Sequence, residues 1–151
     1  MILAPFKSEA TPLGFGLFCL SNPNTIDCTR RSGRVGSLEE IAQVKTQVDR
    51  SFRARNDFRD DWDLLNAENR HGDCEDFALT YRNWLLNNGW PSSALRLATG
   101  LRNGEGHAVL IVSLNGANMV LDILLSRPVP LETYRMTWWE IQSTSDPVHW
   151  D

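Results

Sequence analysis

The sequence predicts an α+β fold, in which a pair of helices precedes an antiparallel sheet within one domain. Two observations predict it. Apolar residues recur at helical spacing in two stretches of the first ninety residues, and later apolar segments are separated by turn signals. The length of 151 residues suits one domain and allows a sizeable core. We therefore expect a single domain over residues 1–151.

The first 36 residues are rich in Gly, Pro, Ser and Asn and show little periodicity, so we expect residues 1–36 to form an irregular N-terminal arm. The first helix is predicted from Leu38 to Arg53. Ser37 precedes it as an N-cap, and Glu40 stands at the capping-box position. Four apolar residues then follow at helical spacing: Ile41, Val44, Val48 and Phe52.

The next stretch, from Arg55 to Arg70, is highly charged and is predicted to be a loop with a short helical turn. A second helix begins near Cys74. It is expected to end at Asn87-Asn88-Gly89, with Pro91 beyond.

Strands are predicted for the rest of the chain, at Leu95–Leu101, His107–Leu114, Met119–Ile123 and Met136–Ser143. Gly104-Glu105-Gly106 separates the first two. Asn115-Gly116 is a strong signal for a two-residue hairpin turn between the second and the third.

Composition excludes several classes of function. The net charge of −4 argues against a nucleic-acid partner, which requires a basic face. No run of about 18 apolar residues is present, so no membrane-spanning segment is expected. The chain starts without the basic and apolar regions of a signal peptide, which indicates either a cytoplasmic protein or a mature or trimmed form.

The three cysteines divide unevenly. Cys19 and Cys28 lie close together, whereas Cys74 stands alone. One interpretation is a disulfide plus one free thiol, which would indicate an oxidising compartment. The other is three reduced thiols in a cytosolic protein.

Cys74 stands where a nucleophile would be useful. The N–H groups and dipole of a helix start lower the pKa of a thiol, and the same N–H groups can contribute to an oxyanion hole. Gly72 just before it leaves room for a substrate. The alternative is that Cys74 simply packs in the core, as most cysteines do.

Three acids, Asp73, Glu75 and Asp76, flank this cysteine. They suit the capping of a helix start, with Asp73 as the N-cap. Carboxylates around a thiol also raise its pKa and hinder its attack. Two arrangements relieve the conflict: the side chains turn away into hydrogen bonds, or a hard cation such as calcium neutralises them.

The hairpin predicts a second pair of groups. With Asn115 and Gly116 as the turn, His107 lies opposite Leu124, and Asp122 is its diagonal neighbour on the same face. Diagonal neighbours lie about 7–8 Å apart between α-carbons, within side-chain reach. The pattern favours a base and its orienting carboxylate, as in catalytic triads. Taken singly, His107 could be an ordinary strand histidine and Asp122 a turn residue.

Four motifs together resemble the bacterial transglutaminase-like cysteine peptidases, the family that includes the LapG-type periplasmic proteases. The motifs are Gly72-Asp73-Cys74-Glu75-Asp76-Phe77-Ala78, Gly89-Trp90-Pro91, Gly104-Glu105-Gly106-His107-Ala108-Val109-Leu110 and Val120-Leu121-Asp122. Their order and spacing agree from about Leu38 to the Trp138-Trp139-Glu140-Ile141-Gln142 segment. Cys19 and Cys28 also resemble the N-terminal cysteine pair of the family.

The resemblance implies a papain/transglutaminase-like core, with the nucleophile at a helix N-terminus packed on an antiparallel sheet. It implies a thiol peptidase with Cys74, His107 and Asp122 as its Cys-His-Asp triad. It makes Asp73, Glu75 and Asp76 candidate calcium ligands. It also implies periplasmic location, a protein substrate such as a large surface adhesin whose cleavage releases biofilm attachment, and a regulatory membrane protein as partner.

Two other functions fit the same residues. One is acyl transfer of the transglutaminase or amidase type, because acceptor choice depends on pocket shape and water exclusion. The other is a non-catalytic, calcium-responsive binding module of the same fold. Ile123, which follows the triad Asp where family members often have Asn, favours the module.

Overall fold

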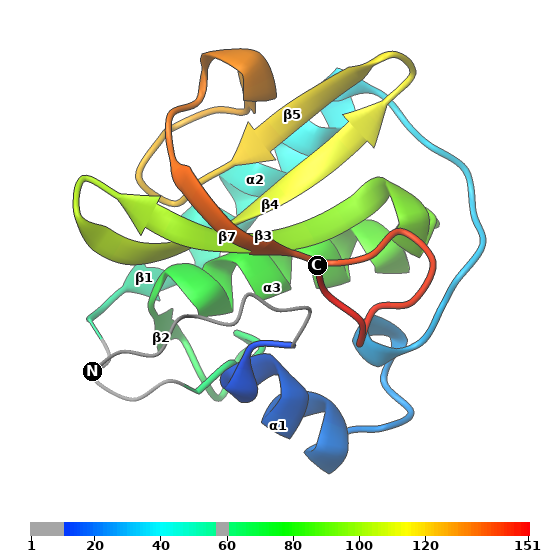
Figure 1. The fold of residues 1–151 in the computed structure, drawn as a ribbon, viewed down its shortest axis with the longest axis vertical. Helices are drawn as coiled ribbons and strands as arrows, with labels where there is room; N and C mark the ends of the chain where they lie inside the picture. Colours follow the sequence, from blue (N-terminus) through cyan, green and yellow to red (C-terminus); the bar gives the residue numbers. More distant parts are fainter. Residues whose placement is uncertain (1–10, 57–60) are drawn as a thin grey trace.

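An antiparallel sheet of five strands, in the order β6-β5-β4-β3-β7, forms the centre of the protein. Figure 1 shows it in a computed structural model that describes residues 11–56 and 61–151. The strands are β1 (Arg53–Ala54), β2 (His71–Gly72), β3 (Leu95–Arg102), β4 (Glu105–Leu114), β5 (Ala117–Leu121), β6 (Val129–Pro130) and β7 (Thr137–Ile141). The helices are α1 (Leu13–Ser21), α2 (Leu38–Ser51) and α3 (Cys74–Asn87), with 3-10 turns η1 (Ile26–Cys28), η2 (Ser92–Ala94) and η3 (Leu131–Thr133). The predicted α+β fold is confirmed.

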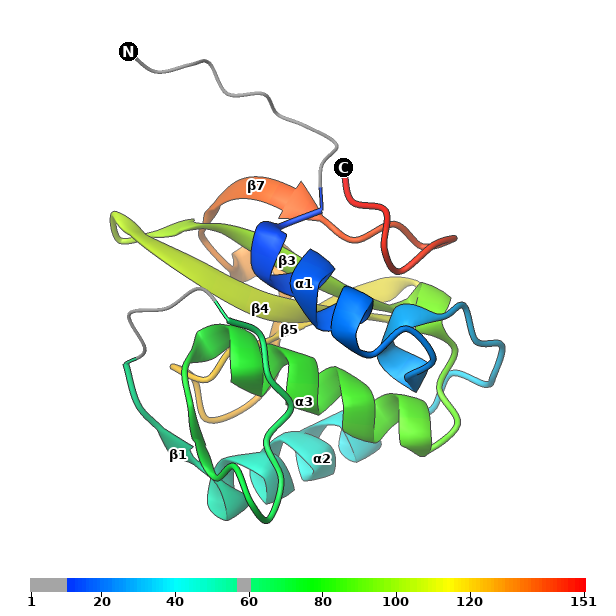
Figure 2. The same ribbon diagram turned by 90° about the horizontal axis from the view of Figure 1, so that it is seen from below.

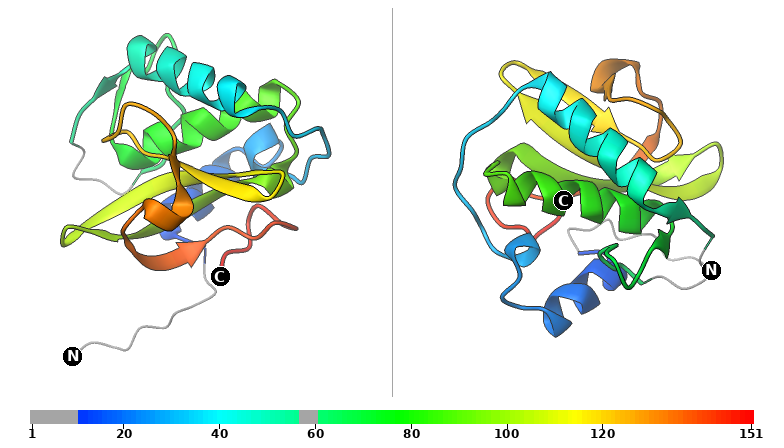
Figure 3. Two further views of the ribbon diagram at one scale, coloured as in Figure 1. Left: turned by 90° about the horizontal axis from the view of Figure 1, so that it is seen from above. Right: turned by 180° about the vertical axis from the view of Figure 1, so that it is seen from behind.

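Both faces of the sheet are buried. Successive side chains of a strand point to opposite faces, and each face packs against its own core. Leu110 and Val112 of β4 face the main core, which α2 and α3 share. Val109 and Ile111 face a smaller core on the opposite side. Figure 3 shows α2 and α3 side by side on one face of the sheet. The site residues of β4 therefore lie in a strand that packing holds from both sides.

The hairpin between β4 and β5 forms with the predicted register. Leu114 pairs with Ala117, and Leu110 pairs with Leu121. Gly116 in the turn has a φ of 81°, which residues other than glycine rarely adopt. The turn thus fixes which residues of the two strands share a face.

The two predicted helices are also confirmed, and a buried charge joins them. The Ser37 hydroxyl accepts a hydrogen bond from the Glu40 amide (3.1 Å) at the start of α2. Lys45 of α2 is fully buried, and its Nζ donates to Asp49 (2.6 Å) and to the Tyr81 hydroxyl of α3 (3.2 Å). The two helices are therefore held in one register on the sheet.

The predicted irregular arm is wrong for residues 13–21, which form α1. Two glycines in nine residues lower the helix propensity, and apolar residues on nearly all sides hide the amphipathic signal. Tertiary packing stabilises this helix instead. The Phe15 ring lies 5.7 Å from the Trp62 ring and 5.4 Å from the Trp150 ring. The first ten residues of the predicted arm lie outside the described residues.

The charged stretch after α2 is a loop, as predicted, in the part that the structure describes. The helical turn expected there does not occur within residues 55–56 and 61–70, and residues 57–60 lie outside the described residues. The residues on either side of the stretch form a short parallel pair, in which Arg53 of β1 pairs with His71 of β2.

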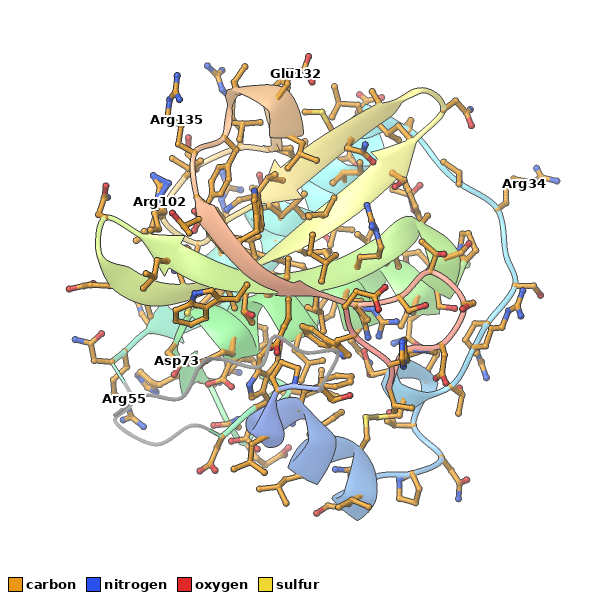
Figure 4. All side chains as sticks on the ribbon, in the orientation of Figure 1. Arg34, Arg55, Asp73, Arg102, Glu132 and Arg135 are labelled. Carbon is orange, nitrogen blue, oxygen red and sulfur yellow. A yellow bond between two sulfur atoms is a disulfide. The ribbon has the colours of Figure 1, made fainter. Side chains whose placement is uncertain are left out.

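Cys19 and Cys28 form a disulfide that joins α1 to η1, which confirms the first of the two interpretations of the cysteines (Figure 4). Next to it, buried Asp27 lies 3.7 Å from the guanidinium of buried Arg82 in α3. Arg82 also donates to the Asp27 and Leu95 carbonyls (2.8 and 3.0 Å). Within the described residues no helix is both long and apolar enough to cross a membrane.

We expect Asp27→Asn to lower the free energy of unfolding by about 3 kcal/mol, because it leaves the buried Arg82 charge without its counter-charge. Urea denaturation at neutral pH measures the change. Asp151→Asn is the matched control, since Asp151 belongs to an exposed ion pair with His149 and should change stability by less than about 0.5 kcal/mol. Equal losses in the two variants would contradict the prediction.

Candidate active site

The start of α3 carries Cys74 as its first residue, and reciprocal hydrogen bonds fix the turn. The Asp73 carboxylate accepts from the Asp76 amide (3.4 Å), and the Asp76 carboxylate accepts from the Asp73 amide (3.2 Å). This is the capping box of a helix N-terminus, with an acid in both roles. The predicted N-cap is confirmed, and Cys74 is held in place by the cap.

Asp76 has a second structural task. Its other carboxylate oxygen accepts from the Asp63 amide (2.8 Å), which ties the preceding loop to the helix start. A Cβ on Gly72 would lie 2.7 Å from this carboxylate and 2.9 Å from Leu65. Gly72 is therefore needed for close packing against the cap rather than for substrate approach.

The Cys74 thiol is mostly buried, and two influences on its charge oppose each other. Burial raises its pKa to about 12, with the Glu75, Asp73 and Asp122 carboxylates adding to the rise. A hydrogen bond from the Ala108 backbone N–H acts the other way. The predicted pKa-lowering effect of the helix start is outweighed, and the opposing effect of the acids is confirmed. The bond from Ala108 also places the thiol beside the residue that follows His107.

His107 and Asp122 meet as the hairpin register predicts. His107 Nε2 lies 2.7 Å from Asp122 Oδ1, and the Asp122 side chain is fully buried one residue after the end of β5. The same Oδ1 accepts from the Leu124 amide (2.9 Å). Because β5 ends at Leu121, Asp122 turns toward His107 at the edge of the paired region.

Two residues that the sequence analysis did not identify complete the surroundings of Asp122. The Tyr134 hydroxyl donates to Asp122 Oδ2 (2.6 Å), and Arg102 Nε lies 3.8 Å from the same oxygen. The Arg102 guanidinium also lies over the Tyr134 ring, 5.0 Å from its centroid. Figure 4 labels Arg102, which is the last residue of β3. No local motif marks either residue, because both reach Asp122 from distant positions in the chain.

These contacts keep Asp122 ionised. Burial acts to raise the pKa of its carboxyl, but hydrogen bonds from His107, Tyr134 and the Leu124 amide outweigh burial and hold the pKa below its usual value. Tyr134 has a raised pKa, so its hydroxyl stays a donor. An ionised Asp122 can orient His107 and stabilise its protonated form.

A cavity of about 350 Å³ opens beside His107. Its walls are formed by Pro12, Leu13, Trp62, Glu75, Thr99, Gly106, His107, Ala108, Trp139 and Glu140.

Two tryptophans of the cavity wall differ in exposure: Trp62 is buried, whereas Trp139 is 47% exposed. Thr99 pairs with Glu140 and Gly100 with Trp138, so Trp139 is the extra residue of a β-bulge. Trp139 therefore lines the cavity from an exposed position of β7 and is not part of the buried core.

The three candidate metal ligands differ in what holds them. Both Asp76 oxygens accept backbone N–H groups. Glu75 Oε2 is buried and has no hydrogen-bond partner among the described residues, and burial followed by the Asp73 carboxyl raises the Glu75 pKa to about 9. Burial also raises the pKa of Asp76, to about 8. Within the described residues no three His, Cys, Asp or Glu side chains converge as a ready metal site. The chemistry of Asp73 and Glu75 fits a hard cation, since a cation would supply the missing partner of Glu75 Oε2.

Comparisons with known proteins identify the family and the fold. The family model described as bacterial transglutaminase-like cysteine proteinase matches residues 6–151. Calcium-bound LapG of Legionella pneumophila has a TM-score of 0.61 and 23% identity, over 68% of this chain and 63% of that one. EGTA-treated LapG has the same TM-score and identity, over 68% of this chain and 61% of that one. The chain thus spans less than two thirds of these structures. No curated protein matches it.

Tyr134→Phe should raise the pKa of Asp122, because it removes one hydrogen bond to the carboxylate. The pKa of Asp122 in the folded protein lies below its unfolded value of about 3.9. The ionised carboxylate therefore stabilises the fold at pH values above about 3.9, and this stabilisation is lost as the pH falls through the folded pKa. The free energy of unfolding of the variant should therefore be lower than that of wild type by about 1–2 kcal/mol at pH 7, and the difference should shrink as the pH falls through the folded pKa. Urea denaturation at a series of pH values measures both.

Tyr81→Phe is the control, since the Tyr81 hydroxyl contacts Lys45 and Asp49 instead. The NMR signal of the His107 ring should move in Tyr134→Phe and stay in place in Tyr81→Phe. A Tyr134→Phe protein with unchanged stability and an unchanged His107 signal would contradict the role of this hydrogen bond.

Proposed function

Because the chain belongs to the bacterial transglutaminase-like cysteine proteinases, we propose that it is an endopeptidase with Cys74, His107 and Asp122 as its catalytic triad. The observation that carries the proposal is the 2.7 Å contact between His107 and buried Asp122, in the wall of a cavity beside the start of α3. Cys74 at that helix start is the free cysteine, since the other two form the disulfide.

The contact between His107 and Asp122 indicates which ring nitrogen of His107 would accept the thiol proton. An ionised Asp122 only accepts hydrogen bonds, so the proton on the ring is at Nε2 and the lone pair is at Nδ1. Nδ1 takes the proton of the Cys74 thiol as the sulfur attacks the substrate carbonyl carbon. The imidazolium then gives this proton to the leaving amine, and a thioester remains on Cys74.

Water completes the reaction. Nδ1 of His107 takes a proton from a water molecule that attacks the thioester carbonyl, and returning this proton to sulfur releases the carboxylic acid product. Asp122 holds the ring in place and stabilises the imidazolium in both half-reactions. The backbone N–H of Cys74, in the first turn of α3, is the donor that we assign to the carbonyl oxygen, because first-turn N–H groups lack intrahelical acceptors.

The resting thiol has a high pKa, so proton removal must accompany attack. Burial and the neighbouring acids disfavour a free thiolate at neutral pH. In the proposed mechanism His107 takes this proton as the sulfur attacks, so negative charge passes to the substrate oxygen and never rests on sulfur alone.

The family likeness supports a proposal for the substrate and the location. We propose a periplasmic enzyme that cleaves a protein substrate, with a large surface adhesin as the leading candidate and a membrane protein as regulator. The Cys19–Cys28 disulfide supports an oxidising compartment.

Calcium is part of the proposal. Asp73 and Glu75 would hold the ion, because both Asp76 oxygens already accept backbone N–H groups, whereas the Asp76 amide donates only to Oδ1 of Asp73. Bound calcium would neutralise acids that raise the pKa of the thiol.

Cys74→Ala should abolish peptide-bond cleavage while leaving the fold intact, because the thiol supplies the attacking atom and, among the described residues, has only the Ala108 N–H as a hydrogen-bond partner. Cleavage of peptides is followed by mass spectrometry, and the fold by circular dichroism. Full activity in Cys74→Ala would remove the triad assignment.

His107→Ala provides the companion measurement. The rate at which iodoacetamide alkylates Cys74 should fall in this variant, because the base is lost. His149→Ala is the matched control, since His149 is exposed and pairs with Asp151. A thiol that reacts slowly in wild type and is indifferent to His107 would point to a binding module that retains only the fold.

Calcium should raise the thermal unfolding midpoint of the wild-type protein, since an ion that binds the folded state stabilises it. Glu75→Gln should reduce this rise, because it removes the charge of the carboxyl whose Oε2 lacks a partner. Calorimetric titration with calcium measures binding directly, apart from activity. Glu105→Gln, in the exposed start of β4, is the control. Equal calcium binding in Glu75→Gln would exclude Glu75 as a ligand.

A further inference from the structure

Exposed apolar residues gather on α1. Four large side chains of this surface are open to solvent: Leu13 (70%), Leu17 (50%), Leu20 (79%) and Val148 (41%). Residues 13–21 include no charged side chain. An apolar surface of this kind on a charged protein marks a place where another apolar surface binds.

This surface is hollowed. A groove of about 460 Å³ runs along it, lined by Thr11, Leu13, Gly16, Leu17, Cys19, Leu20, Pro23, Cys28 and Val148. The Thr11 hydroxyl donates to the Val148 carbonyl and joins the two sides. We call this feature the α1 groove.

The α1 groove meets the cavity beside His107. Leu13 lines both, and Pro12 in the cavity follows Thr11 in the groove. Trp139, another exposed large apolar residue, lines the cavity. Figure 2 shows α1 running alongside α3, on the side away from α2. One path of apolar surface therefore leads from the cavity along α1.

The groove is preformed. Phe15 and Phe18 on the opposite side of α1 are buried, and the Cys19–Cys28 disulfide joins the end of the helix to η1. The outward residues are thus held in place before anything binds, which lowers the entropy lost on binding.

We propose that the α1 groove binds an apolar segment of the same polypeptide chain whose peptide bond is cleaved at Cys74. This inference rests on the proposed endopeptidase function and adds to it a class of substrate: an extended chain with apolar side chains on one side of the scissile bond. From Leu13 to Leu20 the helix rises about 10 Å, the length of roughly three extended residues. Two apolar side chains two residues apart would lie over this length.

The shared residue favours substrate over a second copy of the chain. An occupant that covers Leu13 also covers the edge of the cavity beside His107. A second copy seated on α1 would obstruct the cavity, whereas a substrate that runs from the cavity into the groove uses both.

The test is a cleavage profile of wild-type protein, Leu17→Ser and Leu20→Ser, with tryptic peptides of a bacterial lysate as the probe. Wild-type cut sites should show Leu, Ile, Phe or Met enriched at a fixed distance on one side of the cut. In each variant, kcat/KM for peptides with that pattern should fall about tenfold, the effect of one poorly buried leucine, with little change for peptides that lack it. Leu38→Ser is the matched control, because Leu38 is similarly exposed but lies at the start of α2.

Other outcomes separate the two proposals. Cleavage that needs Cys74 but shows no positional enrichment, or an enrichment that survives in both variants, overturns the groove and leaves the endopeptidase in place. Absence of cleavage, or equal cleavage by Cys74→Ala, overturns the endopeptidase and the groove with it. A wild-type dimer that Leu17→Ser dissociates in analytical ultracentrifugation assigns the groove to a second copy and also overturns the proposal.

Discussion

The candidate site depends on the buried carboxylate of Asp122. A charge inside a protein is costly unless hydrogen bonds replace its water, and here three donors do so: His107, Tyr134 and the Leu124 amide. They come from β4, from the segment after η3 and from the turn after β5. One carboxylate thus fixes the end of the hairpin and aims the histidine ring.

The second half of the site is built separately and brought in by packing. The capping box of Asp73 and Asp76 fixes the first turn of α3, whose buried face rests on the sheet. The Ala108 amide contacts the Cys74 sulfur, so the thiol lies beside the strand that carries His107. A capped helix start and a packed hairpin therefore meet, and the proposed catalytic groups all stand on or next to these elements, which is the arrangement that precise catalysis requires.

The sequence predicted those parts of the molecule that local rules determine. Asn115-Gly116 set the hairpin register, and the register set the meeting of His107 and Asp122. Long-range packing determined the rest. The helix over residues 13–21 depends on Phe15 contacts with distant tryptophans, and Tyr134 reaches Asp122 across a loop that no periodicity describes. The roles of the triad and the calcium ligands remain predictions.

Two acids near the thiol, fully buried Asp122 and half-buried Glu75, have opposite surroundings. Asp122 has donors for both oxygens and a lowered pKa, so its charge is already compensated by the fold. Glu75 has a buried oxygen that no described residue contacts by a hydrogen bond, and its pKa is raised to about 9, so these residues do not compensate its charge. At neutral pH Glu75 must either bind a proton or bind a cation. The proposed calcium site therefore depends on Glu75, whereas the charge of Asp122 is already compensated by the fold.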